Sequence, residues 1–417
     1  MGEPDTLNGH AIDFLRRKNG EPYPVFSNVI KLLKANTATW PLGYDEFSTR
    51  IYYGPEPLED RHILSIAEWV QNHGILASVD VIGSAVQAIA YERPFHQVRE
   101  YLELLEWDQE PRLDRLLPYY AGADDTALIR SQGAKWVIQA VARVMVPGCQ
   151  ADATLVFEGP QGLGKSSFFR VLFGQKWFTD HLPDITNKDA MIQLRGIWCV
   201  EIAELATFTK ADAKHINRFL TSREDTYRPP YGRITAVYPR QTVFAGTVNP
   251  GASGYLKDET GARRFWSVRT SEHLNLAELE TDRDQIWAEA LARYRAGELW
   301  YLNNGVLATE AAAAQSDRYA GDPWQDRIAR FTAKLEKTTL QEVFVEALNL
   351  TTASDQDQRS MNRIAACLSH LGWERYRMPK DANGVRGWGY KRLSQSETQM
   401  SQYELNGLGR EFDLIDQ

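Results

Sequence analysis

The sequence predicts an α/β fold in which a parallel sheet carries a phosphate-binding loop (P-loop). A helical N-terminal domain precedes this core, and a small winged-helix-like domain follows it. The apolar run from Thr154 to Phe157 leads into a glycine-rich loop, and a helical pattern follows at once. Helical periodicity dominates residues 26–106. After Pro323, helical patterns are followed by two β patterns, the order found in a winged helix.

The chain has 417 residues, a length typical of two or three domains. Polar composition marks residues 1–22 as a flexible N-terminal segment. We expect the helical domain at 23–130 and the P-loop ATPase domain at 131–300. A helical connector at 301–322 and the winged-helix-like domain at 323–417 complete the expected organisation.

The composition is that of a soluble globular protein, with 43% hydrophobic and 24% charged residues. The formal net charge of -8 means that any contact with nucleic acid requires a local basic face. The 3 cysteines lie far apart and have no metal-binding spacing, which favours a reducing compartment. No apolar run is long enough to span a membrane, so we expect no membrane partner.

The Gly-x-x-x-x-Gly-Lys-Ser pattern from Gly159 to Ser166 has the spacing of a P-loop. A triphosphate needs several donors around its oxygens, and glycines let backbone N–H groups approach it closely. Lys165 is placed to reach the β- and γ-phosphates, and Ser166 to bind Mg²⁺. The alternative is a glycine-rich turn that contains Lys-Ser by chance. We predict ATP and Mg²⁺ as cofactors, with the nucleotide bound by Gly159, Pro160, Gln161, Gly162, Leu163, Gly164, Lys165, Ser166 and Ser167.

A second apolar strand, from Ile197 to Val200, ends in Glu201, and Glu204 follows three residues later. We expect this strand beside the P-loop strand, with its carboxylates at the edge of the sheet where ligands bind. One carboxylate would orient the Mg²⁺ shell, and another would polarise the attacking water. Glu201 is the first choice for the metal, but the spacing leaves open which acid activates water. The alternative is a solvated acidic turn.

A hairpin is predicted around residues 225–238, with arginine, tyrosine and glycine at its tip. Arginine suits phosphates, an aromatic ring suits the face of a base, and glycine allows close approach. The alternative is a solvated turn with no binding role. We predict that Arg228, Tyr231, Gly232 and Arg233 contact single-stranded nucleic acid.

A third apolar strand, from Gln241 to Val248, ends in Asn249, whose amide suits the attacking water or the γ-phosphate. The alternative is a turn that starts with Asn-Pro. Arg263 and Arg264 precede another strand and are candidates for an arginine finger, or else lie on the surface. In ring ATPases a neighbouring subunit supplies the finger, so this site would be complete only after assembly.

The C-terminal region is basic although the whole chain is acidic. Between residues 359 and 392 only Glu374 and Asp381 are acidic, and a local basic module of this kind fits phosphate contact. The alternative is a wing that contacts another protein. The eight basic residues are Arg359, Arg363, Arg375, Arg377, Lys380, Arg386, Lys391 and Arg392.

The sequence resembles the virulence-associated protein E family, which is found mostly in phages, prophages and related mobile elements. The resemblance is strong over about residues 95–270 and looser in the flanks. It rests on the following motifs: Tyr101-Leu102-x-x-Leu105-x-Trp107-Asp108, Ala142-Arg143-x-x-x-Pro147-Gly148, Glu158-Gly159-Pro160-Gln161-Gly162-x-Gly164-Lys165-Ser166, Glu201-x-x-Glu204-Leu205, Arg228-x-Pro230-Tyr231-Gly232-Arg233, Pro239-Arg240, Gly246-Thr247-x-Asn249 and Thr260-Gly261-x-Arg263-Arg264-Phe265.

This resemblance implies a superfamily 3-like AAA+ ATPase that forms rings, usually of six, and moves one strand through the pore. The hairpin tip would face that pore. Relatives often place two adjacent acids at motif B, whereas the acids here are three apart, so the metal and base assignments stay open. The implied catalytic residues of motifs A, B and C and of the finger are, in that order, Lys165, Glu201 or Glu204, Asn249, and Arg263 or Arg264.

Our first functional hypothesis is an ATP-dependent DNA helicase or translocase that acts on single-stranded or forked DNA. It would serve the replication of a phage or mobile element in the bacterial host cytoplasm, with a primase or replication-initiation protein as a candidate partner. The second hypothesis is an ATP-dependent switch or loader that remodels a protein–DNA complex without unwinding. A small-molecule kinase is a third class, in which the hairpin, the arginine pair and the basic module have no role.

Overall fold

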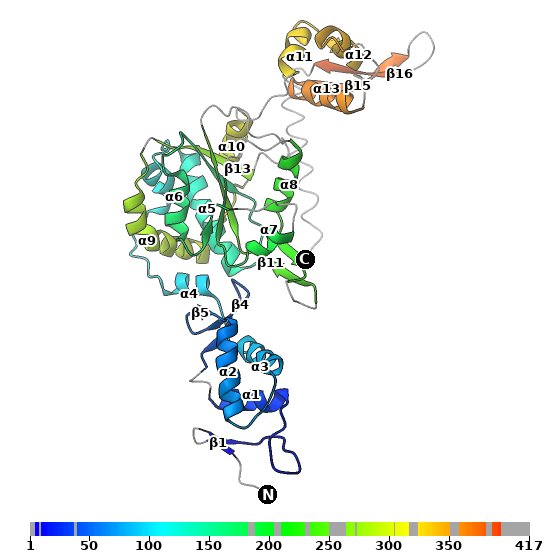
Figure 1. Cartoon of the computed structure of the whole chain (residues 1–417). Helices are drawn as coiled ribbons and strands as arrows, with labels where there is room; N and C mark the ends of the chain where they lie inside the picture. Colours follow the sequence, from blue (N-terminus) through cyan, green and yellow to red (C-terminus); the bar gives the residue numbers. More distant parts are fainter. Residues whose placement is uncertain are drawn as a thin grey trace. The chain divides into compact units, whose positions relative to one another are not determined.

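The chain divides into two compact units, residues 1–319 and 320–417, and each is described by itself (Figure 1). None of the described helices is long and apolar enough to cross a lipid bilayer. The structure is a computed structural model, and it describes residues 5–7, 10–36, 40–181, 188–203, 210–229, 234–249, 264–271, 273–303, 305–316, 324–350, 358–380 and 386–392.

Three helices and two small sheets form the first part of the larger unit. β1 pairs with β2, and the other strands form a sheet in the order β5-β4-β3-β6. Within a region where helical periodicity dominates the sequence, β3 and β4 pair in antiparallel register. The helices bury apolar stripes, in which Val29, Ile66 and Ile82 are fully buried. The elements are β1 (Asp5–Leu7), β2 (His10–Ile12), α1 (Phe26–Ala35), β3 (Leu42–Asp45), β4 (Arg50–Tyr53), β5 (Glu56–Pro57), α2 (Asp60–Asn72), α3 (Val79–Tyr91) and β6 (Pro94–Phe95).

The next helices pack against the main sheet. Val98, Leu102 and Leu113 share one hydrophobic core with Leu155 of the sheet. This core therefore begins ahead of residue 131, where we expected the P-loop domain to start. The elements are α4 (Gln97–Leu104), a 3₁₀ helix (Leu113–Arg115), a π-helix (Leu116–Tyr120) and α5 (Ala127–Met145).

The main sheet has five parallel strands in the order β13-β7-β12-β9-β8. All five carboxyl ends therefore meet at one edge of the sheet, where open parallel sheets bind ligands. The α/β class predicted from the sequence is confirmed. The strands are β7 (Thr154–Glu158), β8 (Phe178–Thr179), β9 (Cys199–Ile202), β12 (Val243–Val248) and β13 (Phe265–Arg269).

One expectation about this sheet was wrong. We expected the strand that carries Glu201 to lie beside the P-loop strand β7, but β12 lies between them. All six residues of β12 are buried, which suits a strand that is paired on both edges and covered on both faces. β9 and its glutamate are consequently one strand further away.

Helices cover both faces of the sheet (Figure 1). Leu155 and Phe157 of β7 pack in the core formed with α5, α6 and α9, whereas Val156 packs in the core formed with α7 and α8. This alternation along β7 is the period of a strand that is buried on both faces. The remaining helices of this unit are α6 (Lys165–Phe173), α7 (Lys188–Gln193), α8 (Lys210–Leu220), α9 (Leu276–Arg295) and α10 (Val306–Ser316).

The predicted hairpin is present as strands β10 (Glu224–Tyr227) and β11 (Ala236–Pro239), which pair in antiparallel register. It follows α8 in the chain and precedes β12. Residues 230–233 at its tip lie outside the described part of the chain.

The smaller unit has its own core, in which Ile328, Ile364 and Leu368 are fully buried. The expected helices and the two strands near the C-terminus are present, and a short third strand completes a sheet in the order β14-β16-β15. The elements are α11 (Gln325–Thr332), β14 (Lys337–Thr338), α12 (Leu340–Glu342), a π-helix (Val343–Ala347), α13 (Gln358–His370), β15 (Trp373–Lys380) and β16 (Arg386–Arg392).

Candidate functional site

The predicted P-loop joins the carboxyl end of β7 to the start of α6. Gly162 and Gly164 have φ values of +85° and +88°, a left-handed conformation that L side chains rarely adopt. Gly159 is required for a different reason, because a Cβ there would lie 2.6 Å from Oγ1 of Thr270. The loop therefore depends on glycine at three positions, two for conformation and one for space.

Lys165, the first residue of α6, has its ammonium group folded back over the loop. Its Nζ donates to the carbonyl oxygens of Gly159 and Pro160, each at 2.6 Å. Burial lowers the pKa of Lys165, and the charge of Glu201 partly offsets this effect. The cation is thus held at the loop by carbonyl oxygens that a phosphate oxygen can replace.

Glu201 on β9 is 1% exposed. Its Oε1 accepts hydrogen bonds from Ser166 Oγ at 2.7 Å and from Thr247 Oγ1 at 2.8 Å. Its Oε2 is buried and has no hydrogen-bond partner among the residues that the structure describes. Burial raises the pKa of Glu201 above its ordinary value, and the two hydroxyl donors partly oppose that rise. Three strand or helix elements, α6, β9 and β12, therefore meet at one carboxylate.

These residues fit a hard divalent cation such as Mg²⁺. Ser166 and Glu201 present adjacent oxygens, and within the described part of the chain the buried Oε2 lacks the partner that such an atom requires. Within the described ranges, no three or more His, Cys, Asp and Glu side chains gather as a metal-binding cluster. Because Mg²⁺ usually keeps waters and takes further oxygens from bound phosphates, one carboxylate and one hydroxyl are an adequate protein contribution.

Asn249 follows the last residue of β12 and is exposed at the same edge of the sheet. The backbone N–H of Gly159 donates to the carbonyl of Val248 at 3.2 Å, so the start of the P-loop and the end of β12 are in contact. Asn249 therefore shares the edge with Lys165 and Glu201. Glu204 lies outside the described residues.

Arg264 lies at the other end of the strands, where their amino ends meet. It directly precedes Phe265, which pairs with Thr154 at the start of β7, whereas Arg269 pairs with Glu158 beside the P-loop. The four steps from Phe265 to Arg269, at about 3.3 Å each, make the separation roughly 13 Å or more. Arg264 is partly buried, and its Nε has no hydrogen-bond partner in the ranges that the structure describes. Arg263 lies outside the described residues.

The hairpin is fixed at its root by two buried arginines. Arg240 pairs with Asp225, with its Nε 3.0 Å from Oδ2, and also donates to the carbonyl of Phe219. Arg143 of α5 is fully buried, and its guanidinium donates to the carbonyls of Arg240 at 3.2 Å and Ser222 at 3.3 Å. Burial lowers the pKa of Arg143 to about 10.

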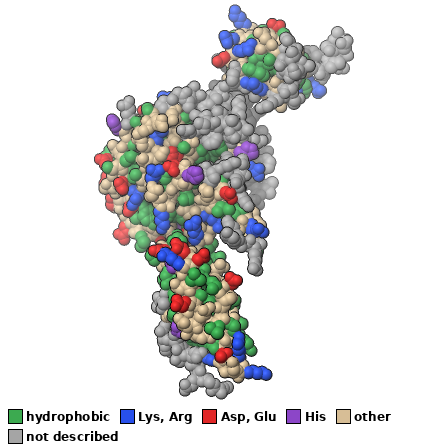
Figure 2. All heavy atoms as spheres, viewed as in Figure 1, with side chains coloured by type: hydrophobic (Ala, Val, Ile, Leu, Met, Phe, Trp, Pro, Cys, Tyr) green, Lys and Arg blue, Asp and Glu red, His purple; other side chains and the backbone are tan. Residues whose placement is uncertain are grey.

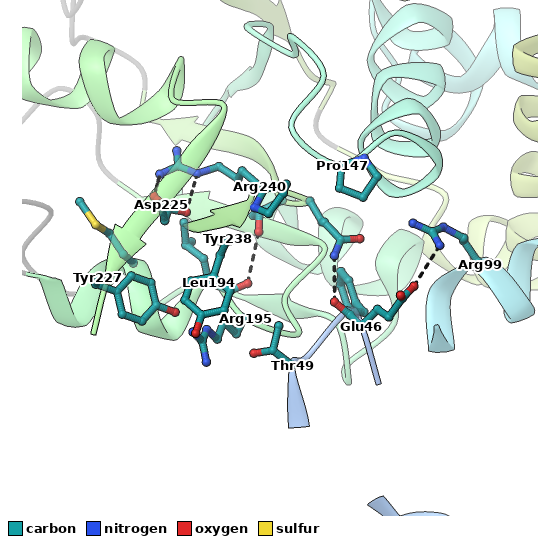
Figure 3. Close-up of a pocket in the computed structure, with 15 residues that line it drawn as sticks. Glu46, Thr49, Arg99, Pro147, Leu194, Arg195, Asp225, Tyr227, Tyr238 and Arg240 are labelled. Carbon is teal, nitrogen blue, oxygen red and sulfur yellow. Dashed lines mark hydrogen bonds and ion pairs between the residues drawn. The ribbon is translucent and has the colours of Figure 1, made fainter. Parts of the chain in front are cut away.

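A cavity of ≈ 260 Å³ lies beside this root (Figure 3). Its wall includes Arg195, whose guanidinium carbon lies 3.7 Å from the ring centroid of Tyr238 and 4.7 Å from that of Tyr227. Arg228, which follows β10, is exposed, while Tyr231, Gly232 and Arg233 lie outside the described residues. Of the four predicted nucleic-acid contacts, the structure therefore places Arg228.

Sequence reasoning missed two threonines at the edge of the sheet where the carboxyl ends of the strands meet. Thr247 interrupts the apolar run of β12, and this lone hydroxyl was the available signal. Thr270 has no comparable signal, because its contact with Gly159 depends on the parallel pairing of β13 with β7. Its backbone N–H donates to the carbonyl of Glu158 at 2.9 Å.

The fold and the loop define an α/β protein whose parallel sheet carries a glycine-rich strand–loop–helix unit at its ligand-binding edge. The family model of the virulence-associated protein E-like domain matches residues 102–320, and the chain belongs to this family. No curated protein matches the chain.

Two solved structures of the NrS-1 C-terminal region are similar to this chain. The A form apo structure of that region has 11% sequence identity and a TM-score of 0.47, and the match covers 89% of this chain and 100% of that one. A second A form apo structure, of residues 305–718, has 9% identity and a TM-score of 0.49, with coverage of 89% and 99%.

Proposed function

We propose that this protein is a P-loop ATPase of the superfamily 3-like AAA+ type that translocates on DNA during replication of a phage or mobile element. The observation that carries the proposal is the carboxylate of Glu201, which accepts hydrogen bonds from Ser166 and Thr247 beside the P-loop and has one buried oxygen with no partner among the described residues. Membership of the virulence-associated protein E-like family supports the replication role.

In this proposal the residues of one chain hold MgATP at the carboxyl edge of the sheet. The P-loop N–H groups and the start of α6 would bind phosphates, and Lys165 would exchange its carbonyl partners for phosphate oxygens. Ser166 and Glu201 would hold Mg²⁺, which when bound neutralises charge on the phosphates and polarises them. Glu201 or Glu204 would orient the water, with Asn249 beside it at the same edge.

The finger in this proposal comes from a neighbouring copy. Arg264 stands at the amino edge of its own sheet and is separated from its own P-loop by the length of β13. A guanidinium at that position is too far from its own P-loop to act there, which supports sites shared between neighbouring copies in a ring. The family resemblance makes six the expected number of copies. The hairpin would then face the pore, and Arg228 would contact single-stranded DNA.

The test is ATP hydrolysis by the full chain with and without single-stranded DNA, combined with strand displacement on forked substrates. Lys165→Ala should abolish hydrolysis, and Arg228→Ala should reduce the stimulation by DNA. Arg130→Ala, an exposed arginine on α5, is the control and should behave as the unmodified chain. Hydrolysis without displacement of either polarity would favour the loader, and unchanged hydrolysis by Lys165→Ala would overturn the proposal.

The assembly requires a separate measurement. The mass of the protein in solution should increase when a non-hydrolysable ATP analogue and single-stranded DNA are added together. A chain that remains monomeric under these conditions while it hydrolyses ATP would contradict the shared site, because Arg264 could not then reach a nucleotide.

A further inference from the structure

The sheet of the smaller unit is strongly basic although the whole chain carries a net charge of -8. Among the residues of β14, β15 and β16 whose side chains the structure places, Glu374 is the one acid, and it pairs with Lys391 at 3.4 Å. Figure 2 shows Lys and Arg side chains on the face of this unit that is in view. The five placed cations are Lys337, Arg375, Arg377, Lys391 and Arg392.

The strand register places two of these cations, Arg375 and Arg377, on the same face as Trp388. Arg377 pairs with Trp388 across β15 and β16, and Arg375 lies two residues away on the same face. The guanidinium carbons of Arg375 and Arg377 lie 4.2 Å and 5.3 Å from the ring centroid of Trp388. The indole of Trp388 on β16 therefore lies beside two guanidinium groups from β15, those of Arg375 and Arg377.

Trp388 is exposed although its face of the sheet also carries the core. Trp373 and Tyr390 on that face are 2% and 4% exposed, whereas Trp388 is 48% exposed. Among the placed side chains of this face, burial therefore decreases from Trp373 and Tyr390 towards Trp388. A large, exposed indole flanked by two guanidinium groups provides an apolar surface that a ligand can cover.

We propose that Arg375, Arg377 and Trp388 form a binding surface for single-stranded nucleic acid, distinct from the hairpin between β10 and β11. The two guanidinium groups would bind phosphates of the backbone, and the indole would stack on an unpaired base. A base inside a duplex is already stacked on its neighbours, so this surface distinguishes single strands from duplexes. An acidic protein would use the cations but would have no use for the exposed ring.

The opposite face of the sheet provides a matched control. Lys337 and Lys391 lie opposite each other there, and Lys337 Nζ is 5.8 Å from the ring centroid of Tyr376. That ring packs onto the sheet at Gly389, where a Cβ would lie 3.0 Å from Tyr376 Cε1. Lys337→Ala/Lys391→Ala removes two positive charges, as Arg375→Ala/Arg377→Ala does, but from the face without the exposed indole.

The experiment measures binding of a labelled oligothymidine to the full chain by fluorescence anisotropy, without ATP and at several salt concentrations. Arg375→Ala/Arg377→Ala should weaken binding about tenfold and reduce the slope of log K against log salt by about 1.4, because two phosphate contacts are lost. The Lys337→Ala/Lys391→Ala control should retain the slope of the unmodified chain. An equal loss of slope in both double variants would overturn the assignment to this face.

A second measurement tests the ring. Trp388→Ala should weaken binding of the oligothymidine about tenfold and leave binding of a blunt duplex unchanged, while Trp388→Phe should retain most of the affinity. Equal losses for both substrates would overturn the stacking role. Because Trp388 is exposed, this change does not open the core.

The inference rests on the proposed function only in its choice of DNA, and the two can fail separately. If Arg228→Ala loses binding and the Trp388 and arginine variants lose none, this surface is rejected and the translocase stands. If the surface variants lose binding but Lys165→Ala still hydrolyses ATP, the proposed function is rejected and the surface stands.

Discussion

Ser166 donates its hydroxyl hydrogen to Oε1 of Glu201 across 2.7 Å, and this bond joins the start of α6 to strand β9. The chain after β9 continues into α8 and then into the hairpin strand β10. A change at the P-loop that alters the partners of Glu201 therefore acts on the segment that leads to the hairpin. The second hairpin strand, β11, continues into β12, whose Thr247 donates to the same carboxylate, so both strands of the hairpin are connected along the chain to strands that meet at Glu201.

Glu201→Gln keeps the size of the side chain and removes its charge. We expect ATP hydrolysis to fall about 100-fold or more, which is the usual contribution of a catalytic acid–base group, while nucleotide affinity changes by a few-fold at most. Turnover and binding of a fluorescent ATP analogue would be measured in parallel. Glu289→Gln is the matched control, because Glu289 is also buried but accepts from the backbone N–H groups of Arg112 and Leu113. An equal loss of turnover in Glu289→Gln would contradict the assignment of Glu201 to the catalytic site.

The same substitution should change how stability depends on pH. Burial raises the pKa of Glu201 from its ordinary value of 4.5, so its stabilising contribution is complete below that value and is lost as pH rises through the folded pKa. The melting temperature of Glu201→Gln minus that of the unmodified chain should therefore increase from pH 5 towards pH 8. Lys165 is present in both proteins, so its own lowered pKa largely cancels in the difference. A difference that decreases with pH would contradict the assigned direction.

The strand–loop–helix unit formed by β7, the glycine-rich loop and α6 was predictable because all its parts are contiguous in sequence and can be recognised together. The order of the strands was not. Glu201 meets Thr247 because Ala245 pairs with Glu201 across β9 and β12, and such a register depends on residues far apart in the chain. The hairpin followed from local alternation, but its root depends on Arg143, which precedes Arg240 by 97 positions. The sequence pattern therefore predicted the local elements but not the pairing of strands and side chains that are far apart in the chain.

Gly159→Ala should disturb the loop through one specific collision. The new Cβ would lie 2.6 Å from Thr270 Oγ1 and 3.2 Å from Leu163 Cδ1. We expect weaker binding of an ATP analogue and a recovery in Gly159→Ala/Thr270→Ala, with a coupling of about 1 kcal/mol in a double-mutant cycle. Gly162→Ala meets no atom within 4 Å, and its φ of +85° should cost about 1 kcal/mol that Thr270→Ala does not restore. Equal rescue of both variants would exclude the collision.

Thr247→Val tests the hydrogen bond from β12 to Glu201 with a side chain of nearly the same shape. Loss of this donor should raise the pKa of Glu201 further, because the bond at 2.8 Å favours the ionised carboxylate. The acid limb of the pH–rate profile for ATP hydrolysis should move to higher pH. Thr332→Val in the smaller unit, whose hydroxyl donates to the carbonyl of Ile328 at 2.8 Å, is the control and should leave the limb in place. A limb that stays fixed in Thr247→Val would show that Glu201 does not govern it.

Asp225→Ala should destabilise the root of the hairpin far more than an equivalent change at the surface. The side chains of Asp225 and Arg240 are 6% and 1% exposed, so the substitution leaves a buried guanidinium without its carboxylate. Removing one partner of such a pair costs about 3–5 kcal/mol. The matched control is Asp125→Ala, which breaks the exposed pair with Arg130 and should cost less than about 1 kcal/mol. Urea unfolding followed by tryptophan fluorescence would compare the two, and equal midpoints would show that the buried pair does not hold the hairpin root.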